Sequence, residues 1–98
     1  MTILAIIRQS DALNNETLEA RITRKYPGEF YKLGKGQWLV NTALNPKDLS
    51  TELGIVKGAH YGNTLIVEVK EYYGLYKKEL WAWLKSRNQD DGLQAERA

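Results

Sequence analysis

At residues 3–7 the chain reads Ile-Leu-Ala-Ile-Ile, and at residues 65–69 it reads Leu-Ile-Val-Glu-Val. Both runs are short and rich in branched apolar residues, which favours strands over helices. In the first run, apolar side chains fall on both faces of the strand because alternate residues point to opposite sides. The runs therefore predict two strands, and the first of them needs a cover on each side.

The sequence predicts a helix, a hairpin and a second helix between these two strands. Asn14 is a suitable N-cap for the first helix, and Asn45 is one for the second. The hairpin turns at residues 34–36, Gly-Lys-Gly, between two alternating segments. A third helix is predicted over residues 75–87, where aromatic and leucine side chains recur with helical spacing.

The order strand–helix–strand–strand–helix–strand predicts an α+β, ferredoxin-like βαββαβ sandwich with an additional C-terminal helix. Right-handed crossovers would make the first and third strands central and leave the second and fourth at the edges. We expect a single domain over residues 1–87 and a polar, disordered tail over residues 88–98.

The predicted fourth strand is an apolar strand at a sheet edge, which promotes aggregation unless another segment covers it. The uncovered face of the sheet is expected to carry Leu4, Ile6 and, less clearly, Leu39. A second copy of the chain could cover both, or the third helix could fold back over the face. We expect the first solution, a homodimer. Its interface would include Leu4, Ile6, Leu65, Ile66, Val67 and Trp81.

Composition limits the classes of function. The 98 residues include no cysteine and a single histidine, His60, so one chain offers neither thiolate chemistry nor a multi-histidine metal site. No apolar run approaches the ~20 residues of a membrane span, and the start lacks the features of a signal peptide. A formal net charge of +2 is too small to indicate nucleic-acid binding by itself. We expect a cytoplasmic protein without cofactor or metal, and we interpret His60 as an exposed loop residue.

Three segments resemble one known family. They are residues 36–42 (Gly-Gln-Trp-Leu-Val-Asn-Thr), the capped helix with Leu49 and Leu53, and residues 63–69 (Asn-Thr-Leu-Ile-Val-Glu-Val). Together they resemble SinR-like proteins, distant relatives of the small ferredoxin-like CRISPR adaptation protein and of virulence-associated protein D. The resemblance covers residues 2–86. It implies homodimers formed through the sheets and a bacterial or phage cytoplasm.

The chain departs from this group at the end of its first strand. The nucleases of the group carry an aspartate there, which binds a divalent metal with its mate across the dimer. This chain has Arg8 and Gln9 at that place, and Asp11 follows slightly later. A cation is unfavourable beside a divalent metal, so we expect no nuclease activity. Asp11 is a weak catalytic candidate, and the alternative interpretation is a turn residue before the first helix.

Three basic residues form a candidate nucleic-acid contact: Arg8, Lys32 and Lys35. Lysine and arginine side chains that neutralise phosphates give binding that ignores sequence and weakens with salt. The alternative is solvated charge that protects an edge strand from aggregation.

The sequence therefore predicts a non-catalytic, homodimeric binding or regulatory protein, and the resemblance suggests a bacterial or phage defence-related system. Two alternatives stay open: a metal-dependent endoribonuclease with a carboxylate at the dimer interface, and a nucleic-acid-binding protein without cleavage. A protein partner other than a second copy also stays open.

Overall fold

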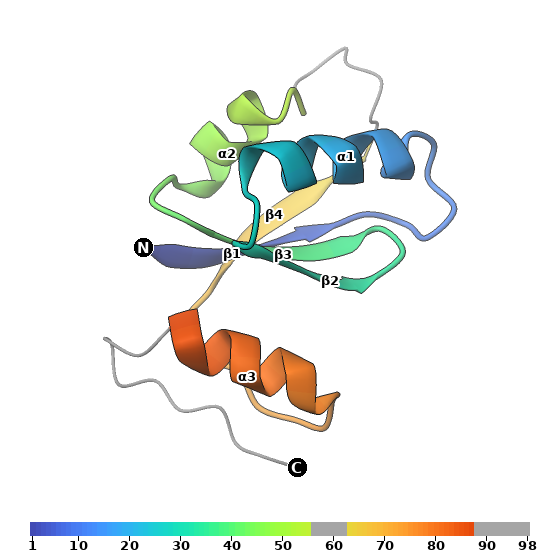
Figure 1. Cartoon of the computed structure of the whole chain (residues 1–98). Helices are drawn as coiled ribbons and strands as arrows, with labels where there is room; N and C mark the ends of the chain where they lie inside the picture. Colours follow the sequence, from blue (N-terminus) through green and yellow to red (C-terminus); the bar gives the residue numbers. More distant parts are fainter. Residues whose placement is uncertain (56–62, 88–98) are drawn as a thin grey trace.

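The computed structural model describes residues 1–55 and 63–87 of the chain (Figure 1). The tail that we predicted at residues 88–98 and the loop residue His60 lie outside the described residues. The elements, in chain order, are β1 (Thr2–Ile7), α1 (Asn15–Lys25), β2 (Phe30–Gly34), β3 (Gln37–Thr42), α2 (Pro46–Glu52), β4 (Leu65–Val69) and α3 (Lys78–Arg87).

The strands form an antiparallel sheet in the order β2-β3-β1-β4, so β1 and β3 are central and β2 and β4 lie at the edges. β1 pairs with β3 on one side, with Ala5 opposite Leu39, and with β4 on the other, with Ala5 opposite Val67. The molecule is a small α+β fold with three helices among the described residues, compatible with a ferredoxin-like arrangement.

Helices α1 and α2 cover one face of the sheet (Figure 1). Asn45 caps α2 as its sequence predicts, because its Oδ1 accepts a hydrogen bond from the Asp48 N–H at 2.7 Å. The cluster beneath the two helices is fully buried and consists of Leu4, Ile6, Leu18, Ile22, Trp38, Val40, Leu49 and Leu53.

The expectation that Leu4 and Ile6 line an uncovered face and a subunit interface is wrong. Both side chains lie under α1 and α2 without exposure to solvent. The alternation of a strand shows which residues share a face, but it does not show which of the two faces the helices cover. Ile3 and Ala5 occupy the second face instead.

Helix α3 lies on that second face, opposite α1 and α2 (Figure 1). Leu80 and Leu84 are buried there against Ile3, Ala5 and Leu39. Leu39 thus belongs to the face for which we expected it, and the third helix supplies the cover. Half-buried aromatic side chains surround this cluster: Tyr31, Tyr72, Trp81 and Trp83.

Trp81 packs within the chain, and its expected interface role stays a prediction. Its side chain is half-buried against the cluster between α3 and the sheet, and its ring lies 6.3 Å from the ring of Tyr72. The indole N–H groups of Trp81 and Trp83 are buried without an acceptor among the described residues. Apolar packing, and not indole hydrogen bonding, therefore holds this side of the helix.

Polar contacts fasten α3 at its end and just before its start. The Arg87 guanidinium donates to Glu29 Oε1 at 3.2 Å and to the Gly28 carbonyl at 2.6 Å, and it lies over the ring of Trp83. The Tyr76 hydroxyl donates to the Leu33 carbonyl oxygen at 2.6 Å. The helix begins at Lys78 instead of residue 75 as predicted.

The packing of α3 leads to a stability prediction. Leu84→Ala should lower the free energy of unfolding by about 2–5 kcal/mol, because it opens a cavity between helix and sheet. Urea denaturation followed by circular dichroism measures this. Leu75→Ala is the matched control: Leu75 is 82% exposed, so its truncation should change stability by no more than about 0.5 kcal/mol. Equal effects of the two substitutions would contradict a packed α3.

Candidate functional site

Arg8 is a buried structural residue and not a free cation. Its side chain is 4% exposed. Nη1 donates to Asn15 Oδ1 at 2.7 Å, Nε donates to Thr64 Oγ1 at 3.1 Å, and Nη2 donates to the Leu13 carbonyl at 3.1 Å. The prediction that Arg8 contacts nucleic acid is therefore wrong.

Strand alternation explains the position of this arginine. Arg8 continues the series Leu4, Ile6, whose side chains point toward α1 and α2, so its side chain points the same way just beyond the end of β1. There it joins the loop after β1, the start of α1 and the residue before β4. A guanidinium satisfies three separate acceptors with one planar group, which suits it to this junction.

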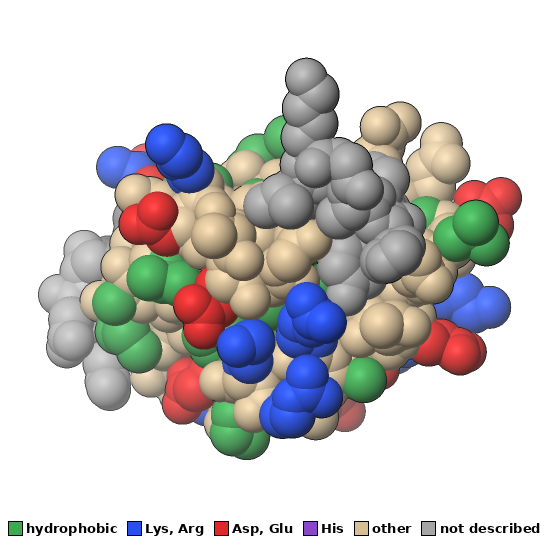
Figure 2. Space-filling model, turned by 90° about the horizontal axis from the view of Figure 1, so that it is seen from above, with side chains coloured by type: hydrophobic (Ala, Val, Ile, Leu, Met, Phe, Trp, Pro, Cys, Tyr) green, Lys and Arg blue, Asp and Glu red, His purple; other side chains and the backbone are tan. Residues whose placement is uncertain are grey.

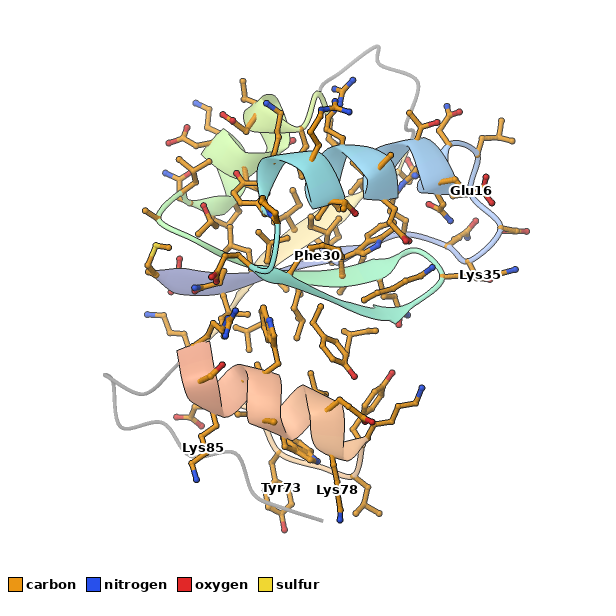
Figure 3. The ribbon with its side chains drawn as sticks, viewed as in Figure 1. Glu16, Phe30, Lys35, Tyr73, Lys78 and Lys85 are labelled. Carbon is orange, nitrogen blue, oxygen red and sulfur yellow. The ribbon has the colours of Figure 1, made fainter. Side chains whose placement is uncertain are left out.

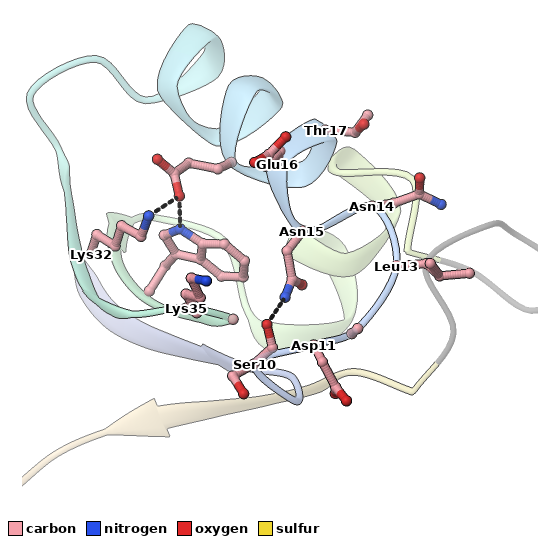
Figure 4. Close-up of a pocket in the computed structure, with 13 residues that line it drawn as sticks. Ser10, Asp11, Leu13, Asn14, Asn15, Glu16, Thr17, Lys32 and Lys35 are labelled. Atoms are coloured by element: carbon pink, nitrogen blue, oxygen red, sulfur yellow. Dashed lines mark hydrogen bonds and ion pairs between the residues drawn. The ribbon is translucent and has the colours of Figure 1, made fainter.

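A cleft of about 380 Å³ lies next to this junction (Figure 4). The loop after β1, the first turn of α1 and the β2–β3 hairpin form its walls. It brings Asp11, Lys32 and Lys35 together, whereas Arg8 is not among its lining residues. Asp11 is exposed in the loop. Asn14, at the start of α1, has a left-handed backbone (φ 68°) and makes no side-chain capping hydrogen bond.

Glu19 organises one wall of the cleft. Its Oε1 accepts from the indole Nε1–H of Trp38 at 3.2 Å and lies 2.9 Å from Nζ of Lys32 (Figure 4). Trp38 is completely buried, so the carboxylate supplies the acceptor that a buried indole needs. Sequence reasoning missed Glu19, although an acid in the helix above a tryptophan strand was a usable signal. Lys32 is thus already paired with a carboxylate of its own chain.

The tip of the hairpin packs closely against the end of β1. The Arg8 backbone N–H donates to the Gly36 carbonyl at 2.7 Å. Gly36 has φ +78°, and a Cβ there would lie 2.7 Å from the Gln9 carbonyl oxygen, so only glycine fits. Lys35 is exposed beside it and forms no ion pair among the described residues.

The charge of the cleft is mixed. Asp11, Glu16 and Glu19 line it together with Lys32 and Lys35. Figure 2, which views the α1 and α2 side, shows basic side chains interspersed with acidic ones over this face. This arrangement does not favour a polyanion over other polar ligands. Among residues 1–55 and 63–87, no group of three or more His, Cys, Asp or Glu side chains could hold a metal ion.

The edge of the sheet at β4 is the second candidate site. Leu65 is 57% exposed and Val67 is 36% exposed, and Ile7, which pairs with Leu65, is 40% exposed. All three lie on the face that α3 covers. Their sequence neighbours Ile6 and Ile66 point to the opposite face, toward the cluster under α1 and α2, and successive residues of a strand alternate between faces. Ile66 points to the other face and is half-buried against that cluster. Ile7 belongs to this surface although sequence reasoning did not include it.

The opposite edge, β2, is built differently. Its middle carries the exposed Lys32, and the pairing with β3 shifts in register between Lys32 and Gly34. The Tyr76 hydroxyl donates a hydrogen bond to the Leu33 carbonyl oxygen of this strand. Lysine, irregular pairing and local cover are the usual means by which proteins block an edge strand. Three features therefore protect β2 from pairing with another strand, whereas β4 presents a run of apolar residues.

Comparison with known proteins adds no assignment: no family model matches the sequence, and no curated protein matches it. Among the described residues, no helix is long and apolar enough to cross a membrane.

The role of Arg8 as an anchor can be tested by substitution. Arg8→Ala should lower the free energy of unfolding by about 3 kcal/mol, because three hydrogen bonds to a charged group are lost from a buried junction. Arg24→Ala is the control, since Arg24 is exposed on α1 without an ion pair among the described residues. Chemical denaturation of both variants measures the difference. A stable Arg8→Ala variant would contradict the structural role.

Proposed function

We propose that this protein is a non-catalytic binding or regulatory protein that acts as a homodimer joined along β4. The observation that carries the proposal is the contrast between the blocked β2 edge and the apolar β4 edge, which no other described strand pairs with on its outer side. The strand order is compatible with a ferredoxin-like fold, and the SinR-like resemblance supports a bacterial or phage cytoplasmic setting for such a dimer.

The sequence of β4 suits pairing with itself. In a two-fold dimer the same surface meets its own copy, so a self-complementary strand is required. Antiparallel pairing centred on Val67 would set Leu65 opposite Val69 of the second copy, and Val67 opposite its own equivalent. On the face that α3 covers, the paired β4 strands would then present only apolar side chains to each other. Ile7 on β1, which pairs with Leu65, would extend this apolar surface. Cross-strand apolar pairs of this kind contribute about 0.2–1 kcal/mol each, in addition to the backbone hydrogen bonds.

The end of β1 supports a role without catalysis. Related nucleases carry their metal-binding aspartate there, and this chain has the buried Arg8 in place of it. The guanidinium contacts Asn15, Thr64 and the Leu13 carbonyl, so the place is filled by a positive charge that holds the fold together. Asp11 lies farther along the loop, exposed to solvent.

The dimer is tested by sedimentation equilibrium over micromolar to millimolar protein. The unaltered chain should be dimeric, and Leu65→Lys and Val67→Lys should each weaken association at least about tenfold, because lysine on an edge strand opposes pairing. Leu13→Lys is the matched control, an exposed leucine in the loop after β1, and should leave association unchanged. A monomer at every concentration would overturn the proposal, as would equal effects of all three substitutions.

The non-catalytic role is tested by incubating the purified protein with single-stranded and structured RNA in manganese or magnesium. The RNA should remain intact over hours, because this chain has Arg8 where the nucleases that it resembles have a metal-binding aspartate. Metal-dependent cleavage that is lost in Asp11→Ala would contradict the proposal and favour the endoribonuclease alternative.

A further inference from the structure

The outer surface of α3, together with the segment before it, is a basic part of the described chain. Residues 70–87 contain five basic residues against two acidic ones, a formal net charge of +3, whereas the entire chain carries +2. The remainder of the chain is therefore slightly acidic. We name residues 70–87 the α3 layer.

The lysines of the α3 layer are exposed on its surface. Lys70, Lys77, Lys78 and Lys85 are exposed, and none of them forms an ion pair among the described residues. Arg87 is different, because it is bound to Glu29 and Gly28. These four lysines outnumber the exposed Glu71 and Glu79 of the layer, so the layer has a net positive charge that attracts a polyanion.

The helix fixes the direction of two of these lysines. Lys78 and Lys85 are seven residues apart, two helical turns or about 10 Å along the axis, and so share one side of α3. Leu80 and Leu84 occupy the opposite side and are buried against the sheet. Figure 3 shows Lys78 and Lys85 projecting from α3 away from the sheet.

An exposed aromatic ring accompanies these lysines. Tyr73 is 79% exposed, and Figure 3 shows it projecting on the same outer side of the molecule as Lys78 and Lys85. The other tyrosines of the layer have partners within the fold: Tyr72 lies against Trp81, and Tyr76 donates to the Leu33 carbonyl. Proteins that bind single strands combine such rings, on which bases stack, with cations that follow the phosphates.

We propose that the outer surface of the α3 layer binds single-stranded nucleic acid, with a base stacked on Tyr73 and phosphates bound by Lys78 and Lys85. Lys70 and Lys77 add to the electrostatic attraction. The binding is independent of base sequence and depends strongly on salt.

A membrane surface fits this part of the molecule less well. An interfacial helix buries its apolar side in the lipid. In α3 the apolar side, with Leu80 and Leu84, faces the sheet, and the outward side carries lysines. Leu75 is the exposed large aliphatic residue of the layer, which gives little apolar area to insert. This surface is separate from the β4 edge. The dimer proposal can therefore be refuted without refuting the nucleic-acid proposal, and the reverse also holds.

The test is fluorescence anisotropy with labelled oligo-dT and oligo-U of about twelve nucleotides at about 50 mM salt. The unaltered chain should bind both. The double variant Lys78→Ala, Lys85→Ala should weaken binding about tenfold or more. It should also reduce the slope of log affinity against log salt by about 1.4, because two phosphate contacts are lost. Tyr73→Ala should weaken binding at least about fivefold, and Tyr73→Phe should preserve it because the ring remains.

The matched control is the double variant Arg24→Ala, Lys47→Ala, which removes two exposed cations from α1 and from α2. It should bind within about twofold of the unaltered chain, and circular dichroism should show that all variants fold. No binding of either oligonucleotide would overturn the proposal. The proposal would also be overturned if the control variant bound as poorly as the α3 variant. The same holds if a duplex bound as tightly as a single strand and independently of Tyr73, or if the chain bound only vesicles of anionic lipid.

Discussion

The rest of the structure depends on the burial of β1 from both sides. Leu4 and Ile6 are covered by α1 and α2, and Ile3 and Ala5 are covered by α3. A central strand with apolar residues on both faces loses much of its stabilisation if either layer is missing. The third helix is therefore a necessary layer of this small domain, held by leucine packing and by Arg87 at its end.

The same alternation determines what the end of β1 can do. It directs Arg8 into the helix layer, where three hydrogen bonds convert a charged residue into a structural junction. The end of β1 thus becomes part of the support for α1 and β4.

The surfaces that our proposals use lie at the periphery of the molecule. In the cleft beside the hairpin, Glu19 pairs with Lys32 and accepts from Trp38, so part of its charge is already satisfied within the chain. Among the described residues, the β4 edge and the outer side of α3 are two surfaces with exposed apolar groups or exposed lysines that form no ion pair. One surface is apolar and suits a second copy, and the other is basic and aromatic and suits a polyanion.

The sequence by itself determined the α+β class, the helix cap at Asn45, the glycine hairpin turn and the apolar character of β1 and β4, because these follow from local propensity and periodicity. It could not determine which face of β1 lies under which helix. Both faces are apolar, so Leu4 and Ile6 were assigned to the wrong side. It also could not show that Arg8 is buried, that Glu19 reaches Lys32, or that α3 covers the second face. These depend on contacts between residues far apart in the chain, which only the tertiary structure brings together.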